Sequence, residues 1–543
     1  MCSTSILKKG IKLYKDVLLS WKTAAWYVWE HKTMYKRRKN MKRYLAFVLA
    51  LVMCLSLGIT AQAAGAEKDK EVLRVAANAE ASTLDPAQTT DASSQQIFNN
   101  IFETLVYEDE EHNIVGKLAE SYEQVDDTTH VFHLRQGVKF TNGEELKASD
   151  VVFTYTRGAE SPKIASYFRD VASVEATGDY EVTITLSKPS APFLSGLTFA
   201  STGIVNEKAI TEAGENTGTQ PVGTGPYKLQ TWDKGVKLVL ERNEDYWGEK
   251  PVFRTVQVVA VPESTNRTIE LESGNVDIAL EIPTTDLNRV RDAEGLTLLE
   301  QPARATTLLG MNCSKAPLDD VRVRQAISHA LDIPTLVKAI KGDTVEVAYS
   351  EISSNMKYYK EITDSHVYDV EKAKELLKEA GYENGFEISI LCDEKKENLD
   401  IATVAQQMLQ AVGITVKINT MEFATMCAEA YAGNSELFIV GWGSGTMDPD
   451  TVLFNCFHSS NAVDGGNNWA RFVNAKADEL LEKSRVVFDD EERTAIYGEI
   501  QDLLAEECPW INIWVRKYFV GIGGNVDSMV MDPNSCYSYY KVK

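Results

Sequence analysis

The sequence predicts a two-lobed α/β protein, and two patterns along its 543 residues support this. For about 230 residues after residue 63, alternating apolar and polar segments typical of strands dominate. From about residue 305, amphipathic helices alternate with strands, the pattern of parallel βαβ units in a doubly wound lobe. A chain of this length is expected to contain more than one compact unit.

The first part of the chain carries one clear helical pattern among its strands. Residues 91–106 place apolar side chains at helical spacing, and an Asn142-Gly143 pair is typical of a hairpin turn. The expected strands are residues 71–76, 129–140, 180–186, 236–240 and 255–261.

In the second part, helix signals and strand signals follow one another. Residues 320–331 have one apolar face, and Asp369 is suited to cap a helix that Gly381 stops. A helix at 399–412 ends at Gly413 and leads into an alternating strand at 414–418. The apolar run 437–440 is expected to be a buried strand.

The N-terminus has the pattern of a secretory signal peptide. An uncharged run, Leu45–Ile59, follows six basic residues and precedes the small-x-small site at Ala61–Ala63. We expect a signal peptide at 41–63 and regard 1–40 as an upstream extension from a misread start. A retained membrane anchor is the alternative, although the run is short for a span. A lipoprotein anchored at Cys54 is a second alternative.

Charge and cysteine usage narrow the class of protein. Residues 1–63 carry 12 basic and 2 acidic side chains, so the remaining residues carry 44 basic and 77 acidic ones. Such an acidic body repels polyphosphate, and no nucleic acid partner is expected. The six cysteines after residue 63 are scattered, and we expect mostly buried free thiols, with pairing outside the membrane left open.

Motifs for catalysis, metal binding and phosphate binding are missing from the sequence. His130 and His133 fall in an alternating strand, where they point to opposite faces and cannot share a metal. The acidic clusters 108–111 and 489–492 are interpreted as solvated loops or helix ends. The missing motifs do not exclude an enzyme, but they favour a binding protein.

Four ordered segments resemble family 5 of the solute-binding proteins, the extracytoplasmic peptide- and nickel-binding components of ABC importers. They are KLAESYEQVDDTTHVFHLRQGVKFTNGEELKASDVVFT from Lys117, PVGTGPYKLQTWDKGVKLVLERNEDYWGEKP from Pro221, MNCSKAPLDDVRVRQAISHALD from Met311 and VGWGSGTMDPD from Val440. We interpret the Gly223–Tyr227 and Asn243–Trp247 parts of the second segment as structural, because glycine, proline and aromatic residues dictate turns and anchors.

The resemblance implies the type II periplasmic-binding-protein fold with an extra inserted subdomain. Lobe I would span 64–304 with the insertion at about 107–220, lobe II 305–508, and residues 509–543 would return to lobe I. The implied function is to capture di- or oligopeptides in the inter-lobe cleft and deliver them to a membrane permease with separate ATPase subunits. A non-peptide solute such as an oligosaccharide or a nickel chelate is the alternative, and a secreted hydrolase or chaperone on this scaffold is a more distant one. A monomer in the periplasm or at the outer cell surface is expected, and a receptor of this family is no enzyme and needs no metal or other cofactor.

The resemblance also points to ligand contacts. In peptide-binding members an Asp three residues after the Trp that matches Trp442 pairs with the ligand's ammonium group, whereas this chain has Gly445 there. Asp448 is a candidate replacement, and the loss could instead mark a change of substrate class. The full set of expected contacts is Trp442, Gly443, Ser444, Gly445, Thr446, Asp448, Asn78, Ala79, Glu80, Ala81, Asn468, Trp469, Trp514 and Arg304. Arg304 could meet a carboxylate or make a salt bridge.

Overall fold

The computed structural model describes residues 71–109, 112–363 and 367–543. The signal peptide and the upstream extension expected at 1–63 lie outside these residues. In the part of the chain that the structure describes, none of the helices has the length and apolar character that a membrane crossing requires.

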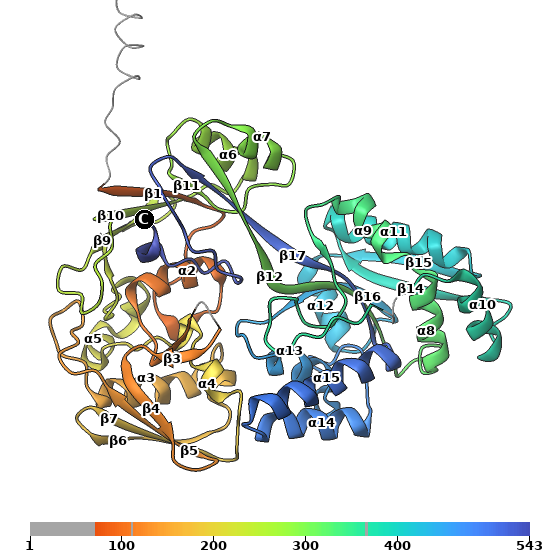
Figure 1. The fold of residues 1–543 in the computed structure, drawn as a ribbon, viewed down its shortest axis with the longest axis horizontal. Coiled ribbons are helices and arrows are strands. Elements are labelled where there is room, and N and C mark those ends of the chain that lie inside the picture. The colour runs from red at the N-terminus through yellow and green to blue at the C-terminus, as the bar shows by residue number, and fades with distance from the viewer. Residues whose placement is uncertain (1–70, 110–111, 364–366) are drawn as a thin grey trace, which may run out of the picture. The chain divides into compact units, whose positions relative to one another are not determined.

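An 11-stranded sheet runs through the described chain (Figure 1). Its order is β15-β14-β16-β12-β17-β11-β1-β10-β9-β8, with β13 paired to β17. The strands are β1 (Val72–Ala77), β8 (Tyr227–Asp233), β9 (Lys237–Arg242), β10 (Thr255–Ala260), β11 (Ile278–Ala279), β12 (Leu296–Met311), β13 (Glu346–Val347), β14 (Phe386–Asp393), β15 (Ile414–Met421), β16 (Leu437–Gly443) and β17 (Trp510–Gly523).

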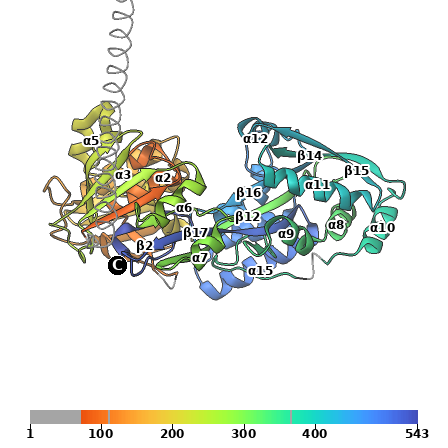
Figure 2. The ribbon, with the colours of Figure 1, turned by 90° about the horizontal axis from the view of Figure 1, so that it is seen from above.

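Two long antiparallel strands, β12 and β17, connect the two lobes (Figure 2). The first half of β12 pairs with the end of β17 beside β11, and the second half pairs with the start of β17 on one side and with β16 on the other. The register shifts between Pro302 and Thr306, where the pair passes from one lobe to the other. The same two strands therefore belong to both lobes.

Lobe I is built around β1, which pairs in parallel with both β10 and β11. Its core joins apolar side chains of these strands to α2 and to the C-terminal segment. The helices of this lobe are α2 (Ala92–Ile101), α6 (Ser264–Glu272) and α7 (Leu287–Asp292). The helix α5 (Glu207–Ala213) falls within the range expected for the insertion, but its Ile210 packs against this core.

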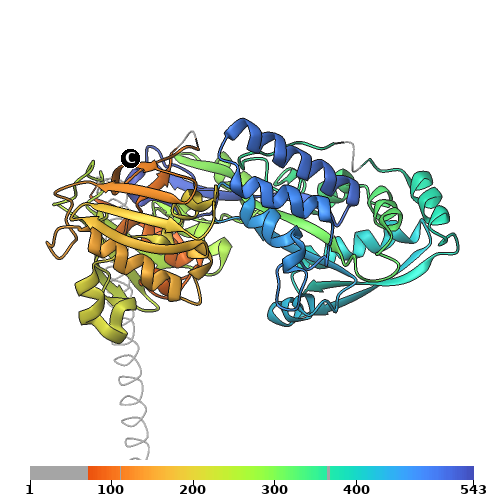
Figure 3. The ribbon, with the colours of Figure 1, turned by 90° about the horizontal axis from the view of Figure 1, so that it is seen from below.

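A subdomain with its own sheet and core is inserted into lobe I, seen in orange to yellow in Figure 3. The helix α3 (Ala148–Glu160) packs on this sheet, and Phe132, Val182 and Ile184 are buried beneath it. Its strands are β2 (Val106–Glu108), β3 (Ile114–Gly116), β4 (Ala119–Gln124), β5 (Thr129–Leu134), β6 (Val171–Gly178) and β7 (Glu181–Leu186), and the short helix α4 is Phe193–Gly196. As predicted, His130 and His133 point apart: His130 is buried against Phe193, whereas His133 is half-buried near Glu181.

Lobe II is the predicted doubly wound unit, because β14 pairs in parallel with both β15 and β16. One apolar core lies on each side of these strands. Its helices are α8 (Val321–Ala330), α9 (Ile333–Lys341), α10 (Val370–Glu379), α11 (Lys396–Gln410), α12 (Phe423–Tyr431), α13 (Asp450–Phe457), α14 (Ala475–Val486) and α15 (Asp490–Glu507). Asp369 caps α10 as predicted, accepting a hydrogen bond from the amide of Lys372.

Two predicted elements are shorter than expected. The helix expected at 91–106 ends at Ile101, because the Gly223–Pro226 turn packs on its last carbonyls and the amide of Gly225 donates to the oxygen of Ile101. A side chain at Gly223 would come within 2.1 Å of that oxygen, so the turn needs glycine. The strand expected at 129–140 ends at Leu134, and Gly137 then turns the chain with a φ of 76°.

The six cysteines of the described chain are free thiols, as predicted, and four of them are buried. Burial raises the pKa of Cys313 and of Cys392 to about 11. These two thiols are therefore protonated near neutral pH and poorly reactive.

Candidate functional site

The end of β16 presents backbone on one face and an aromatic cluster on the other. Gly441 and Gly443 are exposed, whereas Trp442 between them turns toward the core of lobe II. Its ring meets that of Trp469 edge-on, with the ring centres 5.4 Å apart. The packing of Trp442 and the exposure of the two glycines make the backbone at 441–443 the accessible part of this strand.

The turn that follows β16 is held by its own polar groups. The hydroxyl of Ser444 donates to the carbonyl oxygen of Thr446 at 2.7 Å and accepts from the amide of Thr446 at 3.1 Å. Asp448 is buried, with one oxygen 2.8 Å from Nη2 of Arg493 and the other accepting from the hydroxyl of Tyr497 at 3.3 Å. Burial alone would lower the pKa of Arg493, but the Asp448 carboxylate raises it. Asp448 is therefore already paired inside lobe II.

Gly445 lies at the edge of a cavity of about 490 Å³ whose other walls come from lobe I, the inserted subdomain and the C-terminal segment. A side chain at this position would come within 2.8 Å of the ring of Phe199, which stacks on the ring of Tyr167. The carbonyl oxygen of Gly445 accepts a hydrogen bond from the side-chain amide of Asn534 at 3.1 Å. Aromatic rings of the inserted subdomain thus fill the space that an Asp at 445 would need.

The cavity wall in lobe I is organised by Glu103. Its carboxylate accepts from the hydroxyl of Tyr246 at 2.8 Å, from the indole of Trp247 at 2.7 Å and from the hydroxyl of Thr224 at 2.9 Å. The ammonium of Lys117 lies 3.2 Å away. The structural role predicted for the Asn243–Trp247 segment is confirmed by these bonds, because the polar tips of its two aromatic rings anchor on Glu103.

Arg304, in the crossing strand β12, also lines this cavity and forms an ion pair with Glu108. Its backbone oxygen accepts from the amide of Ser444, and its own amide donates to the oxygen of Pro533. The interpretation of Glu108 as a solvated acid was wrong, because its side chain is only 15% exposed beside a buried guanidinium. Of the two roles considered for Arg304, the structure shows the salt bridge.

The residues after β1 divide into two groups. The amide of Asn78 donates to both carboxylate oxygens of Glu281 at 3.0 Å, and Ala79 is exposed beside it. Glu80 instead accepts from the indole of Trp232 at 2.7 Å, and Ala81 is buried. Within this segment, Asn78 therefore faces Glu281 and Ala79 is accessible to solvent, whereas Glu80 and Ala81 pack within lobe I.

Three other expected contacts occupy packing positions. Asn468 is fully buried and bridges the backbone of its own loop, accepting from the amide of Phe472 and donating to its oxygen. Trp469 belongs to the aromatic cluster of Trp442, and Trp514 belongs to the other core of lobe II. A ligand contact for these three residues stays a prediction, and their burial favours a packing role.

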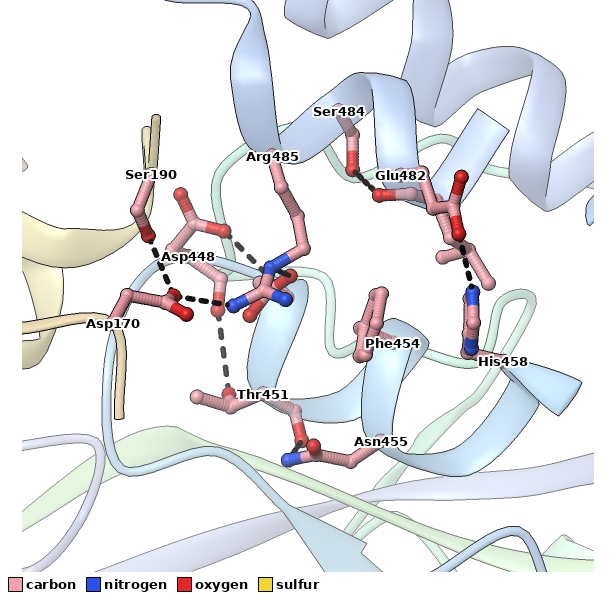
Figure 4. Close-up of polar contacts among 12 residues, drawn as sticks. Asp170, Ser190, Asp448, Thr451, Phe454, Asn455, His458, Glu482, Ser484 and Arg485 are labelled. Atoms are coloured by element: carbon pink, nitrogen blue, oxygen red, sulfur yellow. Dashed lines mark hydrogen bonds and ion pairs between the residues drawn. The ribbon is translucent and has the colours of Figure 1, made fainter. Parts of the chain in front are cut away.

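Arg485, in the last turn of α14, joins lobe II to the inserted subdomain (Figure 4). Its Nη2 lies 2.9 Å from Oδ2 of Asp170, and its Nε lies 3.1 Å from Oδ1 of Asp450 in its own lobe. The amide of Ala191 also donates to the backbone oxygen of Arg485 at 2.7 Å. Burial raises the pKa of Asp450 to about 6, although the Arg485 guanidinium opposes this. We refer to Asp170 and Arg485 as the inter-lobe ion pair.

Several residues of this region carry no signal in the sequence. Glu103 lies in a segment that was interpreted only as a helix, Lys117 in one that served only for the family resemblance, and Asn534 in a polar C-terminal stretch. Glu281 and Arg516 are isolated charges in the neighbourhood of strands, and only the pairing of β11 with β17 brings them together. Among the described residues no group of three or more His, Cys, Asp or Glu side chains is placed to hold a metal ion.

The comparison with protein families decides the class. The model described as "Bacterial extracellular solute-binding proteins, family 5 Middle" matches residues 113–464, which is more than half of the chain. The chain belongs to this family. Family 5 consists of solute-binding proteins rather than enzymes, and the resemblance noted from the four sequence segments is confirmed.

Relatives in family 5 cover nearly the whole chain. The glutathione-binding protein GsiB of Escherichia coli (strain K12) is 28% identical over 499 residues, which are 90% of this chain and 97% of that protein. The periplasmic binding protein DppA of Helicobacter pylori, solved in complex with the peptide STSA, is 28% identical with a TM-score of 0.73 and covers 88% of this chain and 99% of its own. HbpA2 of Haemophilus parasuis is 27% identical with a TM-score of 0.81, covering 87% and 99%. The predicted two-lobed fold is confirmed by these structures.

Proposed function

We propose that this chain is the extracytoplasmic receptor of an ABC importer and captures short peptides between its two lobes. The observation that carries the proposal is the crossing of β12 and β17, which gives each lobe one half of the same two strands. A bend of this pair would bring the backbone at 441–443 toward the end of β1, and a ligand between them would favour the bent state.

The lobe boundaries that we propose are those expected from the sequence. Lobe I comprises 64–304 with the insertion at about 107–220, lobe II comprises 305–508, and 509–543 return to lobe I. The crossing strands support this division, because the register shift of β12 lies at Pro302–Thr306.

The proposed ligand is a peptide because of what the relatives bind. The name of the Escherichia coli relative states glutathione, and the Helicobacter pylori relative was solved with the peptide STSA. The exposed backbone of β16 at 441–443 is suited to pair with an extended peptide in the manner of an added strand. Gly443 and Ala79 remain our proposed backbone contacts.

The proposed partners are membrane permease subunits with separate ATPase subunits, and the chain itself would act as a monomer without a cofactor. Its place would be the periplasm or the outer cell surface, after export by the expected signal peptide. We expect it to release its ligand unchanged, so incubation with peptides should yield no cleavage products.

Thermal unfolding of the purified protein against a ligand panel tests the proposal. The panel contains di-, tri- and longer peptides, amino-acetylated peptides, oligosaccharides and nickel chelates. A ligand at 100 times its dissociation constant adds about 2.7 kcal/mol to the free energy of unfolding, which raises Tm by several degrees. A shift with peptides alone is the expected result. A shift only with sugars or chelates, or peptide hydrolysis by the purified protein, would contradict the proposal.

A further inference from the structure

Three charged or polar side chains of lobe I meet where its parallel strands end. Asn78 follows the carboxyl end of β1, Glu281 follows the carboxyl end of β11, and Arg516 lies in the crossing strand β17 that pairs with β11. In open α/β sheets, ligands bind outside the carboxyl ends of parallel strands. This junction also adjoins the exposed end of β16, because the guanidinium of Arg516 lies beside Gly441.

The backbone at Glu281 is held in an unfavourable conformation. Its φ is 52°, which a residue with a side chain rarely adopts. The guanidinium of Arg267 fixes this bend by donating to the backbone oxygens of Leu280 at 2.6 Å and of Glu281 at 2.9 Å. The hydrogen bonds of Arg267 thus go to backbone oxygens and orient Glu281, and Arg267 acts on the Glu281 carboxylate only through its charge, without a direct hydrogen bond in the described chain.

The carboxylate of Glu281 has one polar partner among the described residues, the side-chain amide of Asn78. An amide stabilises a carboxylate less than a cation does. Burial raises the pKa of Glu281, while Arg267, Asn78 and Arg516 oppose the rise. A half-buried carboxylate in this position is therefore suited to gain a cationic partner.

Arg516 is the complementary group. The residue is half-buried, and in the described part of the chain its guanidinium makes no hydrogen bond and no ion pair. A side chain on Gly441 would come within 3.1 Å of Nη2, and the absence of one leaves that side open. Asp448 and Arg493 of lobe II, by comparison, form a direct ion pair at 2.8 Å. Glu281 and Arg516 interact electrostatically but form no such direct ion pair in the described chain.

We propose that Glu281 and Arg516 together bind an α-amino acid head, Glu281 taking its ammonium group and Arg516 its carboxylate. The inference rests on the proposed function and narrows its substrate class to solutes with both charges on one carbon, as at the γ-glutamyl end of glutathione. It also explains why Gly445 is tolerated. The ammonium group is received at Glu281, so the space at 445 is free for the ring of Phe199.

The test crosses two variants with blocked ligands in titration calorimetry of the purified protein. The probes are S-methylglutathione and two of its derivatives. In one the α-ammonium group of the γ-glutamyl residue is acetylated, and in the other the α-carboxylate of the same residue is converted to an amide. S-methylation prevents exchange with protein thiols. Glu281→Gln should weaken binding of S-methylglutathione about 10- to 100-fold, as expected for a charge-assisted contact, but should leave binding of the N-acetyl form unchanged. Arg516→Met should show the same selectivity for the free carboxylate against the amide.

Two controls separate recognition from folding. Arg516→Lys keeps the charge and loses the planar fork, so it should recover part of the affinity. Lys517→Met removes the neighbouring cation, which pairs with Glu346 at 3.2 Å, and should change the affinity for all three probes little. Each variant should unfold without ligand within a few degrees of the wild type, because neither Glu281 nor Arg516 closes an ion pair.

The outcomes distinguish a failure of the head-group inference from a failure of the proposed peptide receptor. If wild type binds the peptide STSA but not S-methylglutathione, or if the variants weaken all probes equally, the head-group inference is overturned while the peptide receptor stands. If wild type binds no peptide at all, the proposed function fails and the inference falls with it. If free glutamate binds as tightly as S-methylglutathione, with the same selectivity in the variants, the head-group site is supported and the ligand is a free amino acid.

Discussion

At position 445 the space for a side chain is already taken. The departure from the family's Asp was visible in the sequence, but its cause was not, because Phe199 lies 246 residues away in the inserted subdomain and reaches Gly445 only in the fold. The replacement proposed from the sequence, Asp448, turns out to be occupied by Arg493 and Tyr497. The loss of the family's ammonium-binding Asp at position 445 could thus be predicted from the sequence, but the residue that takes over its role could not.

Gly445→Asp tests this explanation. The new carboxylate would press on the ring of Phe199, so we expect a fall in Tm of several degrees and no gain in peptide affinity. Adding Phe199→Ala should relieve the clash, and the double variant should lose less stability than the sum of the two single variants. Calorimetric unfolding of the four proteins gives the comparison. Strict additivity would show that the two positions do not touch.

Glu351 provides a prediction of pH dependence. It is buried, with Asn512 and Ser350 as its polar neighbours, and burial raises its pKa from 4.5 to about 7. Because the folded state holds the proton more tightly than the unfolded state, stability is lost as pH rises from about 4.5 to about 7. At about 1.4 kcal/mol for each pH unit, the loss is about 3 kcal/mol.

Glu351→Gln should remove that loss, since an amide keeps the hydrogen bonds without ionising. We expect the variant to be more stable than wild type at pH 8 and nearly equal at pH 4.5. Chemical unfolding at both pH values checks this. The same difference at both would mean that Glu351 does not titrate in this range.

At the scale of elements, the crossing strands depend on glycines at close contacts. A side chain on Gly310 in β12 would come within 2.1 Å of the ring of Phe438 in β16, to which Gly310 pairs. Gly310→Ala should therefore lower the free energy of unfolding by about 1–3 kcal/mol, the usual cost of overpacking.

Gly441→Ala is the matched variant. Its new side chain would meet the guanidinium of Arg516, the far end of a long side chain that can shift, so stability should change little. Ligand affinity should fall, because the open backbone at 441–443 is the proposed peptide contact. The two variants thus separate packing from binding, and equal losses of stability in both would contradict the distinction.

Local patterns were sufficient for elements whose partners are near in sequence. The strands β1 and β15, the helix α10 with its Asp369 cap and the parallel arrangement of lobe II all agree with the prediction. The strand β12 was not predicted, because Glu300 and Arg304 interrupt its apolar pattern and its partner β17 follows about 200 residues later. The ligand site shares this limit, since Glu281 and Arg516 are brought together by the same long-range pairing.

At the scale of the whole molecule, the inter-lobe ion pair is one of the connections that the lobes make besides the crossing strands (Figure 4). Asp170→Asn should weaken it and let the lobes separate further without ligand, at a stability cost on the order of 3 kcal/mol for a broken buried pair. An increased radius of gyration in small-angle X-ray scattering is the expected readout. Lys188→Met is the control, because Lys188 is exposed and lies 3.5 Å from the same carboxylate. An unchanged radius in Asp170→Asn would show that this ion pair does not set the lobe positions.

The central claim is that the chain binds a short peptide at one site between its lobes. Calorimetric titration of the purified protein with S-methylglutathione and with the peptide STSA tests it most directly. The account predicts saturable binding of at least one of them with one site per chain, and a negative heat-capacity change from buried apolar surface. No saturable heat with either peptide at millimolar concentration would contradict it.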